Sequence, residues 1–249
     1  MKILLLDIET FPNIAFVWGK YQQDVIRYVQ EGCIATFVAK WLDGKMISRA
    51  LPDYAGYKPS SYDDKLITKD LWKLFDEADA IVAHNGKDFD LKVCRARFIY
   101  HNLPPPSPVK CIDTKDIVKK VARFNSAKMD DLGQLLGYGK KIKTDFDLWE
   151  GCIRGDRESW RLMIKYNRRD VILLEKVYKR LLPWIGNHPN MGIGKDAVCP
   201  KCGSERVQFR GVTITTTQSY QRFQCQDCGG WGRMTKRTER AVVTHAQTE

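Results

Sequence analysis

The sequence has 249 residues, of which 43% are apolar and 29% charged, so it can form one sizeable globular domain and a second, small one. It contains no run of 18 apolar residues and no secretory signal peptide, so we expect no membrane partner and a cytoplasmic location. The formal net charge of +11 favours an anionic partner such as nucleic acid, with a merely solvated basic surface as the alternative.

The first predicted strand covers residues 2–10, KILLLDIET. Its unbroken apolar run, Ile3–Leu6, is typical of a central strand buried on both faces. Asp7 and Glu9 follow, and the period of two in a strand places both carboxylates on one face, about 7 Å apart. Such a pair repels strongly unless a cation lies between them, and hard oxygen ligands suit Mg²⁺ or Mn²⁺. A strand end that has reached solvent is the alternative.

The segments after this strand predict an α/β domain with a mixed sheet, because strands come first and then alternate with helices. We expect residues 14–18 and 25–29 to form an antiparallel meander with the first strand. The other expected elements are strands at 34–41, 45–50, 80–83 and 109–112, helices at 63–77, 114–122, 130–136 and 156–182 and one ending near 100, and a Gly/Lys-rich loop at 137–144 that could touch phosphates.

Two more acids occur where a metal site would need them. Asp90 lies in the first turn of the helix that ends near residue 100. Asp170 lies on the long helix, and Tyr166, four residues earlier, is on the same helical face. Spacing alone leaves open whether these acids meet Asp7 and Glu9, since an exposed helical aspartate is the ordinary case. For His84 we prefer a structural role at a strand end.

Near the C-terminus, two Cys-x-x-Cys pairs are each followed directly by glycine. Two such turns predict a tetrahedral four-thiolate site for one structural Zn²⁺, with a disulfide framework as the alternative. The segment between them suits the strands of a small β zinc ribbon, and its basic and aromatic residues suit nucleic-acid binding. The predicted zinc ligands are Cys199, Cys202, Cys225 and Cys228, and the expected packing cysteines are Cys33, Cys94, Cys111 and Cys152.

Three segments, LLLDIET, AHNGKDFDL and YNRRD, resemble in order the three exonuclease motifs of the DEDD (DnaQ-like) superfamily. The resemblance covers residues 1–182 and implies a ribonuclease H-like fold, with a five-stranded mixed sheet flanked by helices. It is nearest to the proofreading-type exonucleases of family B polymerases and their stand-alone relatives, often found in phages. Tyr166 matches the tyrosine branch, because Lys165 stands where the other branch has histidine. In the second motif the pattern selects Asp90 over Asp88.

The resemblance implies a site for two Mg²⁺ or Mn²⁺ ions, one activating the attacking water and the other stabilising the departing 3′-oxygen. Tyr166 would orient the water, because a phenol stays protonated at neutral pH. Phe11 or Phe89 would wedge or stack on bases. The implied metal ligands are Asp7, Glu9, Asp90 and Asp170, and the implied contacts to the terminal nucleotide are Thr10, Phe11, Asn85 and Phe89.

These features predict a metal-dependent 3′→5′ exonuclease acting on single-stranded DNA, in a bacterial cell or phage-infected host. The alternatives are the same chemistry on RNA, structure-specific cleavage, or a non-catalytic nucleic-acid-binding scaffold. The zinc ribbon would bind nucleic acid or a replication or repair protein. The expected divisions are an exonuclease domain at 1–183, a linker at 184–195, the ribbon at 196–238 and a disordered tail at 239–249.

Overall fold

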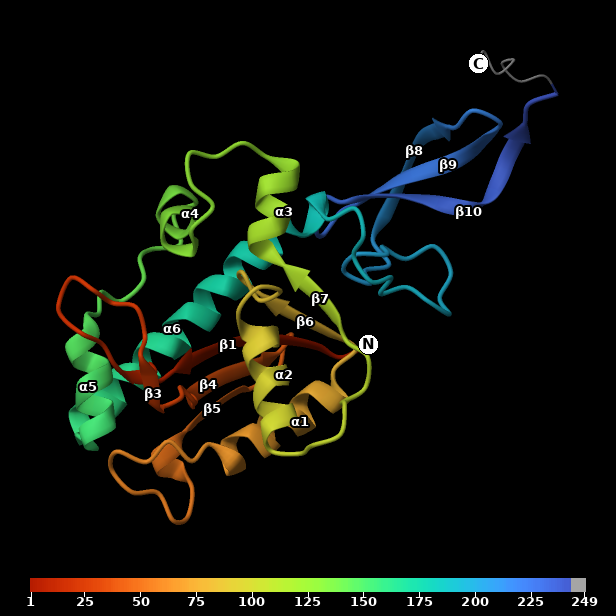
Figure 1. The fold of residues 1–249 in the computed structure, drawn as a ribbon. Coiled ribbons are helices and arrows are strands. Elements are labelled where there is room, and N and C mark those ends of the chain that lie inside the picture. Colours follow the sequence, from red (N-terminus) through yellow and green to blue (C-terminus); the bar gives the residue numbers. More distant parts are fainter. Residues whose placement is uncertain (243–249) are drawn as a thin grey trace, which may run out of the picture. The chain divides into compact units, whose positions relative to one another are not determined.

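A computed structural model describes residues 1–242 of the chain (Figure 1). The chain divides between Tyr178 and Lys179 into two compact units, which are described in turn. No helix among the described residues is long and apolar enough to cross a membrane. Of the expected disordered tail, residues 243–249 lie outside the described residues.

The first unit is built on a five-stranded sheet in the order β5-β4-β1-β6-β7. Strand β1 runs antiparallel to β4 and parallel to β6, so the sheet is mixed. This confirms the predicted α/β fold with a mixed five-stranded sheet. The strands are β1 (Ile3–Thr10), β4 (Ile34–Trp41), β5 (Met46–Ala50), β6 (Ala80–Ala83) and β7 (Lys110–Asp113).

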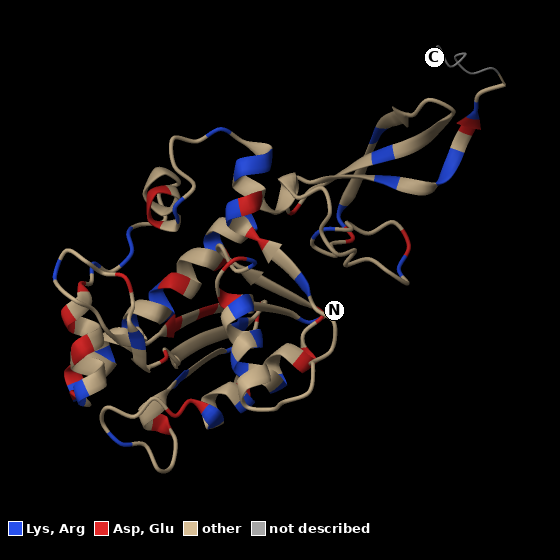
Figure 2. Cartoon of the chain, in the orientation of Figure 1, with Lys and Arg blue, Asp and Glu red and all other residues tan. Residues whose placement is uncertain are grey.

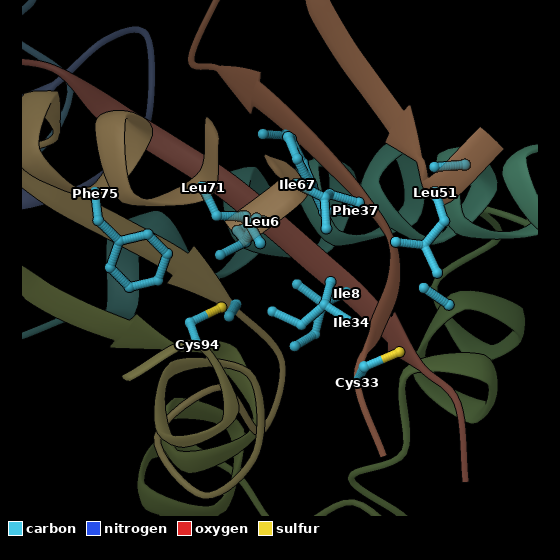
Figure 3. Packing of buried hydrophobic residues seen from close by; sticks show 14 of the residues in the cluster. Leu6, Ile8, Cys33, Ile34, Phe37, Leu51, Ile67, Leu71, Phe75 and Cys94 are labelled. Atoms are coloured by element: carbon cyan, nitrogen blue, oxygen red, sulfur yellow. The ribbon is translucent and has the colours of Figure 1, made fainter. Parts of the chain in front are cut away.

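Helices cover both faces of this sheet (Figure 1). On one face, Leu6 and Ile8 of β1 belong to a buried apolar cluster with side chains of α1 and α2 (Figure 3). On the other face lies α6, where Asn167 donates a hydrogen bond to Asp7. The helices are α1 (Lys65–Glu77), α2 (Asp90–Tyr100), α3 (Thr114–Val121), α4 (Met129–Leu135), α5 (Phe146–Arg154) and α6 (Arg157–Leu181), with a short 3₁₀ helix at Leu51–Asp53. A second 3₁₀ helix, Leu182–Trp184, belongs to the second unit.

Strand β1 is central because side chains cover it on both faces and strands flank it on both edges. Leu4, Leu5 and Leu6 are fully buried. Because successive side chains of a strand point to opposite faces, Leu6 and Ile8 face the core around α1, whereas Asp7 and Glu9 face α6. The apolar run therefore places β1 so that Asp7 and Glu9 face α6, the helix that carries the predicted ligand Asp170.

Two expectations for the first unit are corrected. Within residues 1–242, strands β2 (Ile14–Phe16) and β3 (Arg27–Gln30) pair only with each other, so the predicted meander with β1 is wrong. The physical reason is that β4 already occupies one hydrogen-bonding edge of β1 from Leu4 to Thr10, and β6 occupies the start of the other edge, Ile3–Leu5. Helix α5 was not expected at all. Its Leu148 and Cys152 join the core, as do the predicted packing cysteines Cys33 and Cys94.

The second unit contains a three-stranded antiparallel sheet in the order β10-β9-β8, which confirms the predicted small β domain beside the cysteines. Its strands are β8 (Val207–Ile214), β9 (Gln218–Cys225) and β10 (Trp231–Arg240). The strand β10 includes residues 239 and 240, the first two residues of the expected tail. Few of the unit's described residues are buried, among them Val198, Phe223 and two of the cysteines.

Candidate functional site

Three carboxylates meet where the C-terminal half of β1 passes α6. Asp7, Glu9 and Asp170 each offer an oxygen atom within 4.8 Å of the others. Asp7 and Glu9 are brought there by the alternation of the strand, and Asp170 by the helix packed against that face. The structure thus joins predicted residues from the two ends of the first unit, at a distance that allows one cation to be shared.

Asp90 lies beside this group, in the first turn of α2. It is only 4% exposed, and its Oδ1 accepts a hydrogen bond of 3.1 Å from the backbone N–H of Ile8, between the two acids of β1. Asp88, the other aspartate of this segment, is 71% exposed and pairs with Lys92 at the surface. The structure therefore places Asp90, and not Asp88, next to the carboxylate group.

Burial raises the pKa values of all four acids, and repulsion within the group adds to this effect at Asp7 and Glu9. Burial, then repulsion from Asp90 and Glu9, raises the pKa of Asp7 well above its usual range. Burial, with Asp170 nearby, raises the pKa of Glu9 to about 8, and burial raises that of Asp90 to about 6. Burial also raises the pKa of Asp170, against the opposing charge of Lys141. Without bound cations, the group therefore retains protons near neutral pH.

The two side-chain oxygen atoms of Asp170 indicate that the acid group could bind cations in place of protons. Both carboxylate oxygens of Asp170 are buried and lack an aligned hydrogen bond within the described chain, although Lys141 Nζ lies 2.5 Å from Oδ2. A buried carboxylate without donors is costly unless a positive charge lies against it. Lys141 supplies one such charge, and the clustered oxygen atoms of Asp7, Glu9 and Asp170 also fit divalent cations, which bind oxygen ligands of this kind.

Lys141 is the main member of the site that sequence reasoning missed. It comes from the Gly/Lys-rich loop at 137–144, and its Nζ lies 2.5 Å from Asp170 Oδ2 and 3.5 Å from the Tyr166 hydroxyl. Its backbone N–H donates to Asp130 Oδ1 at 2.6 Å, which holds the loop turned inward. The sequence showed three lysines in this loop and no signal that selects one of them.

Helix α6 contributes two further side chains on the face of Asp170. Burial and the charges of Glu9 and Asp170 raise the pKa of Tyr166, so its hydroxyl stays protonated and can donate a hydrogen bond. Asn167, which is fully buried, donates from Nδ2 to Asp7 Oδ2 at 2.9 Å and thereby fixes the orientation of that carboxylate. Sequence reasoning missed Asn167, although its position three residues before Asp170 places it on the same helical face.

The residues expected to contact a terminal nucleotide differ in their accessibility. Phe11 is only 2% exposed and packs against Tyr62 and Trp160, with ring centroids at 5.3 and 5.7 Å. Because the Phe11 ring fills the core, Phe89 is favoured over Phe11 as the ring that stacks on a base. Phe89 is 42% exposed and remains available. Thr10 is partly exposed, and its carbonyl accepts a hydrogen bond from Trp149 Nε1.

Asn85 lies at a strained turn after β6, with a φ of +72°. Its backbone N–H donates to Asp113 Oδ1 at 3.0 Å, and its side-chain oxygen accepts from Lys115 Nζ at 3.0 Å. Asp113, which also caps α3, is thus a structural support that sequence reasoning missed. The ring nitrogens of His84 lie 2.9 Å from Thr114 Oγ1 and from the carbonyl oxygen of Ala127. These two contacts agree with the structural role that we expected for His84 at a strand end.

The second unit brings its four predicted cysteines together. Their sulfur atoms lie within 4.8 Å of one another, and the Cys199–Cys228 and Cys202–Cys225 sulfur pairs are each 3.6 Å apart. A tetrahedron with Zn–S bonds of about 2.3 Å has edges of about 3.8 Å, so the four thiols fit one zinc ion.

The two turns that present these sulfur atoms need glycine directly after each Cys-x-x-Cys pair. Gly203 and Gly229 adopt φ values of +75° and +74°, a left-handed conformation that glycine takes without strain. Backbone donors at Cys228 and Asp227 outweigh burial and lower the pKa of Cys225 to about 7, which favours the thiolate that binds metal.

Comparison with known proteins identifies the fold family of the first unit. A family model described as the RNase_H superfamily matches residues 30–182, more than half of the chain. The chain belongs to the RNase H superfamily. No curated protein matches it.

Solved structures agree on the fold, and 162 of their chains match. One is the family B DNA polymerase of the hyperthermophilic archaeon Pyrobaculum calidifontis, with a TM-score of 0.54 and 16% sequence identity. The match covers 74% of this chain and only 25% of the polymerase, and at this identity it shows the fold alone.

Membership of the RNase H superfamily supports a nuclease that acts on nucleic acid with divalent metal ions. The family match begins after Asp7 and Glu9 and ends at Leu182. The two acids of β1 are therefore tied to this RNase H-like site by their position beside Asp170. The cysteine site lies outside the matched residues, so the family says nothing about its role.

Proposed function

We propose that the chain is a metal-dependent 3′→5′ exonuclease that hydrolyses phosphodiester bonds of single-stranded DNA. The observation that carries this proposal is the convergence of Asp7, Glu9 and Asp170 within 4.8 Å, next to the buried Asp90. Four carboxylates carry four negative charges, which two divalent cations would neutralise. The structural neighbour named above is a DNA polymerase, which makes DNA the first substrate to test, with RNA beside it.

In this proposal the four acids hold two Mg²⁺ or Mn²⁺ ions. The bound ions would lower the pKa of the attacking water and stabilise the negative charge on the departing 3′-oxygen. Asn167 holds the Asp7 carboxylate through its 2.9 Å hydrogen bond, and the Ile8 N–H holds Asp90. These two hydrogen bonds fix the ligand oxygens in place before substrate arrives, which preorganises the site.

The remaining side chains would handle the water and the nucleotide. Tyr166 is neutral, so its hydroxyl would orient the water through a hydrogen bond rather than remove its proton. Lys141 would place a positive charge near the phosphate as negative charge develops on it. Asn85, Thr10 and the exposed ring of Phe89 would contact the terminal nucleotide.

In the second unit the four cysteines would hold one structural Zn²⁺. Their sulfur spacing of 3.6 Å and the two glycine-containing turns support this assignment. The ion would tie the ends of β8, β9 and β10 together, and it takes no part in hydrolysis.

The decisive experiment is a gel assay on single strands labelled at the 5′ end, with Mg²⁺ or Mn²⁺. DNA and RNA are run side by side with wild type, Asp7→Asn and Asp88→Asn. We expect a DNA ladder that shortens from the 3′ end in wild type and Asp88→Asn and is lost in Asp7→Asn. The Asp88→Asn variant is the matched control, because it removes the same charge from an exposed carboxylate.

Each other outcome has a definite meaning. Intact strands in every lane would support a non-catalytic binding scaffold. Shortening of RNA alone would support an exoribonuclease, and cleavage inside a strand would support an endonuclease. Full activity in Asp7→Asn would refute the assignment of the site.

A further inference from the structure

One face of the ribbon sheet gathers arginines and aromatic rings. Antiparallel partners project their side chains to the same face, and Arg222 lies opposite Arg233 in the register of β9 and β10. Tyr220, two residues before Arg222 on β9, has the same direction and lies opposite Arg237. The guanidinium of Arg210 reaches Gln224 on this face, at 2.8 Å. We call this set the arginine face: Arg210, Tyr220, Arg222, Trp231, Arg233 and Arg237.

The opposite face of the same sheet already serves the unit's own packing. Phe223 is 3% exposed and packs edge-on against Phe209, with ring centroids 6.1 Å apart. Gly232 lies beneath Phe223, where a Cβ atom would come within 2.4 Å of the ring. Since the core lies on that side, the arginine face is not needed to fold the unit.

Each central arginine of the face lies against an aromatic ring. The guanidinium carbon of Arg222 is 5.2 Å from the centre of the Trp231 ring, and that of Arg233 is 4.2 Å from the centre of the Tyr220 ring. Between them is a pocket of about 310 Å³ lined by Thr213, Arg222, Trp231, Gly232 and Arg233. Trp231 is 46% exposed, so one face of the pocket is an accessible indole.

No carboxylate among the described residues pairs with the arginines of this face. Asp227 lies in a turn and pairs with Arg206 at 2.7 Å, and Glu239 is opposite Ser219, whose side chain points to the other face. Figure 2 shows that the charged residues on the strands of this unit are mainly Lys and Arg. Two arginines directly across a strand pair repel each other, so this arrangement gains from an anionic partner.

We propose that the arginine face binds single-stranded nucleic acid, with phosphates on Arg222 and Arg233 and a base stacked on Trp231. Guanidinium groups interleaved with accessible aromatic rings are what a single strand needs, because it presents alternating charges and base faces. An acidic peptide would use the charges but leave the indole unused. This binding site goes beyond the proposed hydrolysis and does not depend on it.

The test measures binding apart from cleavage. Full-length zinc-loaded protein carrying Asp7→Asn is titrated with a fluorescent single-stranded DNA at several salt concentrations, without added Mg²⁺. In this background we expect Arg222→Gln with Arg233→Gln to raise Kd at least about tenfold. The slope of log K against log salt should fall by about 1.4, since each phosphate contact on a single strand contributes about 0.7. Trp231→Ala should raise Kd about tenfold with little change in slope.

A control and a competitor keep the result decisive. Arg161→Gln removes one charge from an exposed arginine of α6 and should leave Kd within about twofold. Retained zinc content shows that each ribbon variant is folded. Unchanged Kd in both ribbon variants would overturn the proposal. Equal displacement of the DNA by a poly-glutamate peptide would also overturn it, in favour of an acidic protein partner.

Discussion

The carboxylate cluster of the first unit and the cysteine cluster of the second unit are held together by different means. In the first unit, Asp7, Glu9 and Asp170 are held by strands and a helix whose apolar side chains form a large core. In the second unit, four thiols are held by two short turns, with few buried side chains around them. The apolar core of the first unit holds the acids together despite their mutual repulsion. In the second unit, few buried side chains help the two turns to hold the thiols in place.

The contrast indicates that the carboxylate site is a product of folding, whereas metal binding at the cysteine site helps to cause folding. A core that exists without metal can hold unfavourable carboxylates ready for cations. A small domain with little apolar burial needs its metal to supply folding free energy. The following predictions test this contrast, in decreasing order of expected change.

Removing all metal with a chelator should unfold the second unit and leave the first unit folded. Zinc binding to four thiolates supplies roughly 10 kcal/mol or more in small zinc domains. Hydrogen exchange followed by mass spectrometry should show loss of protection in β8–β10 and retained protection in β1. Cys225→Ser should have the same effect without a chelator, and Cys111→Ser, in the first unit, should keep one zinc per chain. Loss of protection in β1 as well would contradict the expectation that the first unit stays folded without metal.

Core truncation should destabilise the first unit far more than surface truncation near the same acids. Phe11→Ala empties a site that is only 2% exposed and should lower the free energy of unfolding by about 3–5 kcal/mol. Phe89→Ala, at a ring that is 42% exposed, should change it by about 0.5 kcal/mol or less. Urea denaturation of the first unit measures both. Equal effects would mean that Phe11 does not support the site through the core.

The stability of the first unit without added Mg²⁺ or Mn²⁺ should fall as pH rises from about 5 to about 8. Burial and Asp170 raise the pKa of Glu9 from 4.5 to about 8, so the folded state binds a proton that the unfolded state releases. That contribution is fully present below the unfolded pKa and is lost as pH rises through the folded pKa. The loss should be on the order of a few kcal/mol, since one pKa unit corresponds to about 1.4 kcal/mol.

Urea midpoints at several pH values, in zinc-loaded protein, measure this trend. Glu9→Gln should flatten it, because the amide does not titrate, and added Mn²⁺ should restore stability at pH 8. A midpoint that rises between pH 5 and pH 8 in the absence of divalent ions would contradict repulsion within the acid group.

Lys141→Met should lower the stability of the first unit by about 1–2 kcal/mol at pH 8. Its ammonium lies 2.5 Å from a carboxylate that is 1% exposed, but the lysine itself is 31% exposed, which weakens the pair. The effect should shrink at pH 5, where the acids hold protons, and with Mn²⁺ bound. Lys92→Met, from an exposed pair, should change stability by about 0.5 kcal/mol or less. An equal loss of stability in both variants would mean that Lys141 does not stabilise the acid group.

Much of the fold was predictable because local patterns carried it. The apolar run before Asp7 predicted a buried central strand, and Leu4–Leu6 are fully buried. The paired Cys-x-x-Cys turns predicted their own cluster, since each turn fixes two sulfur atoms by itself. The pairing of β2 was mispredicted, because a short segment with strand propensity does not reveal which edge is free.

Local sequence patterns were enough to predict the direction of side chains within each element. They put Asp7 and Glu9 on one face of a strand, and Tyr166 and Asp170 on one face of a helix. Which faces meet depends on the tertiary fold, as does the contact of Lys141 with the acids and the burial of Phe11 in the core. The reason is that these two levels of structure depend on interactions of different range along the chain. Backbone geometry fixes the spacing within an element, whereas the partner of each face is settled by competition among all apolar surfaces and open strand edges of the chain.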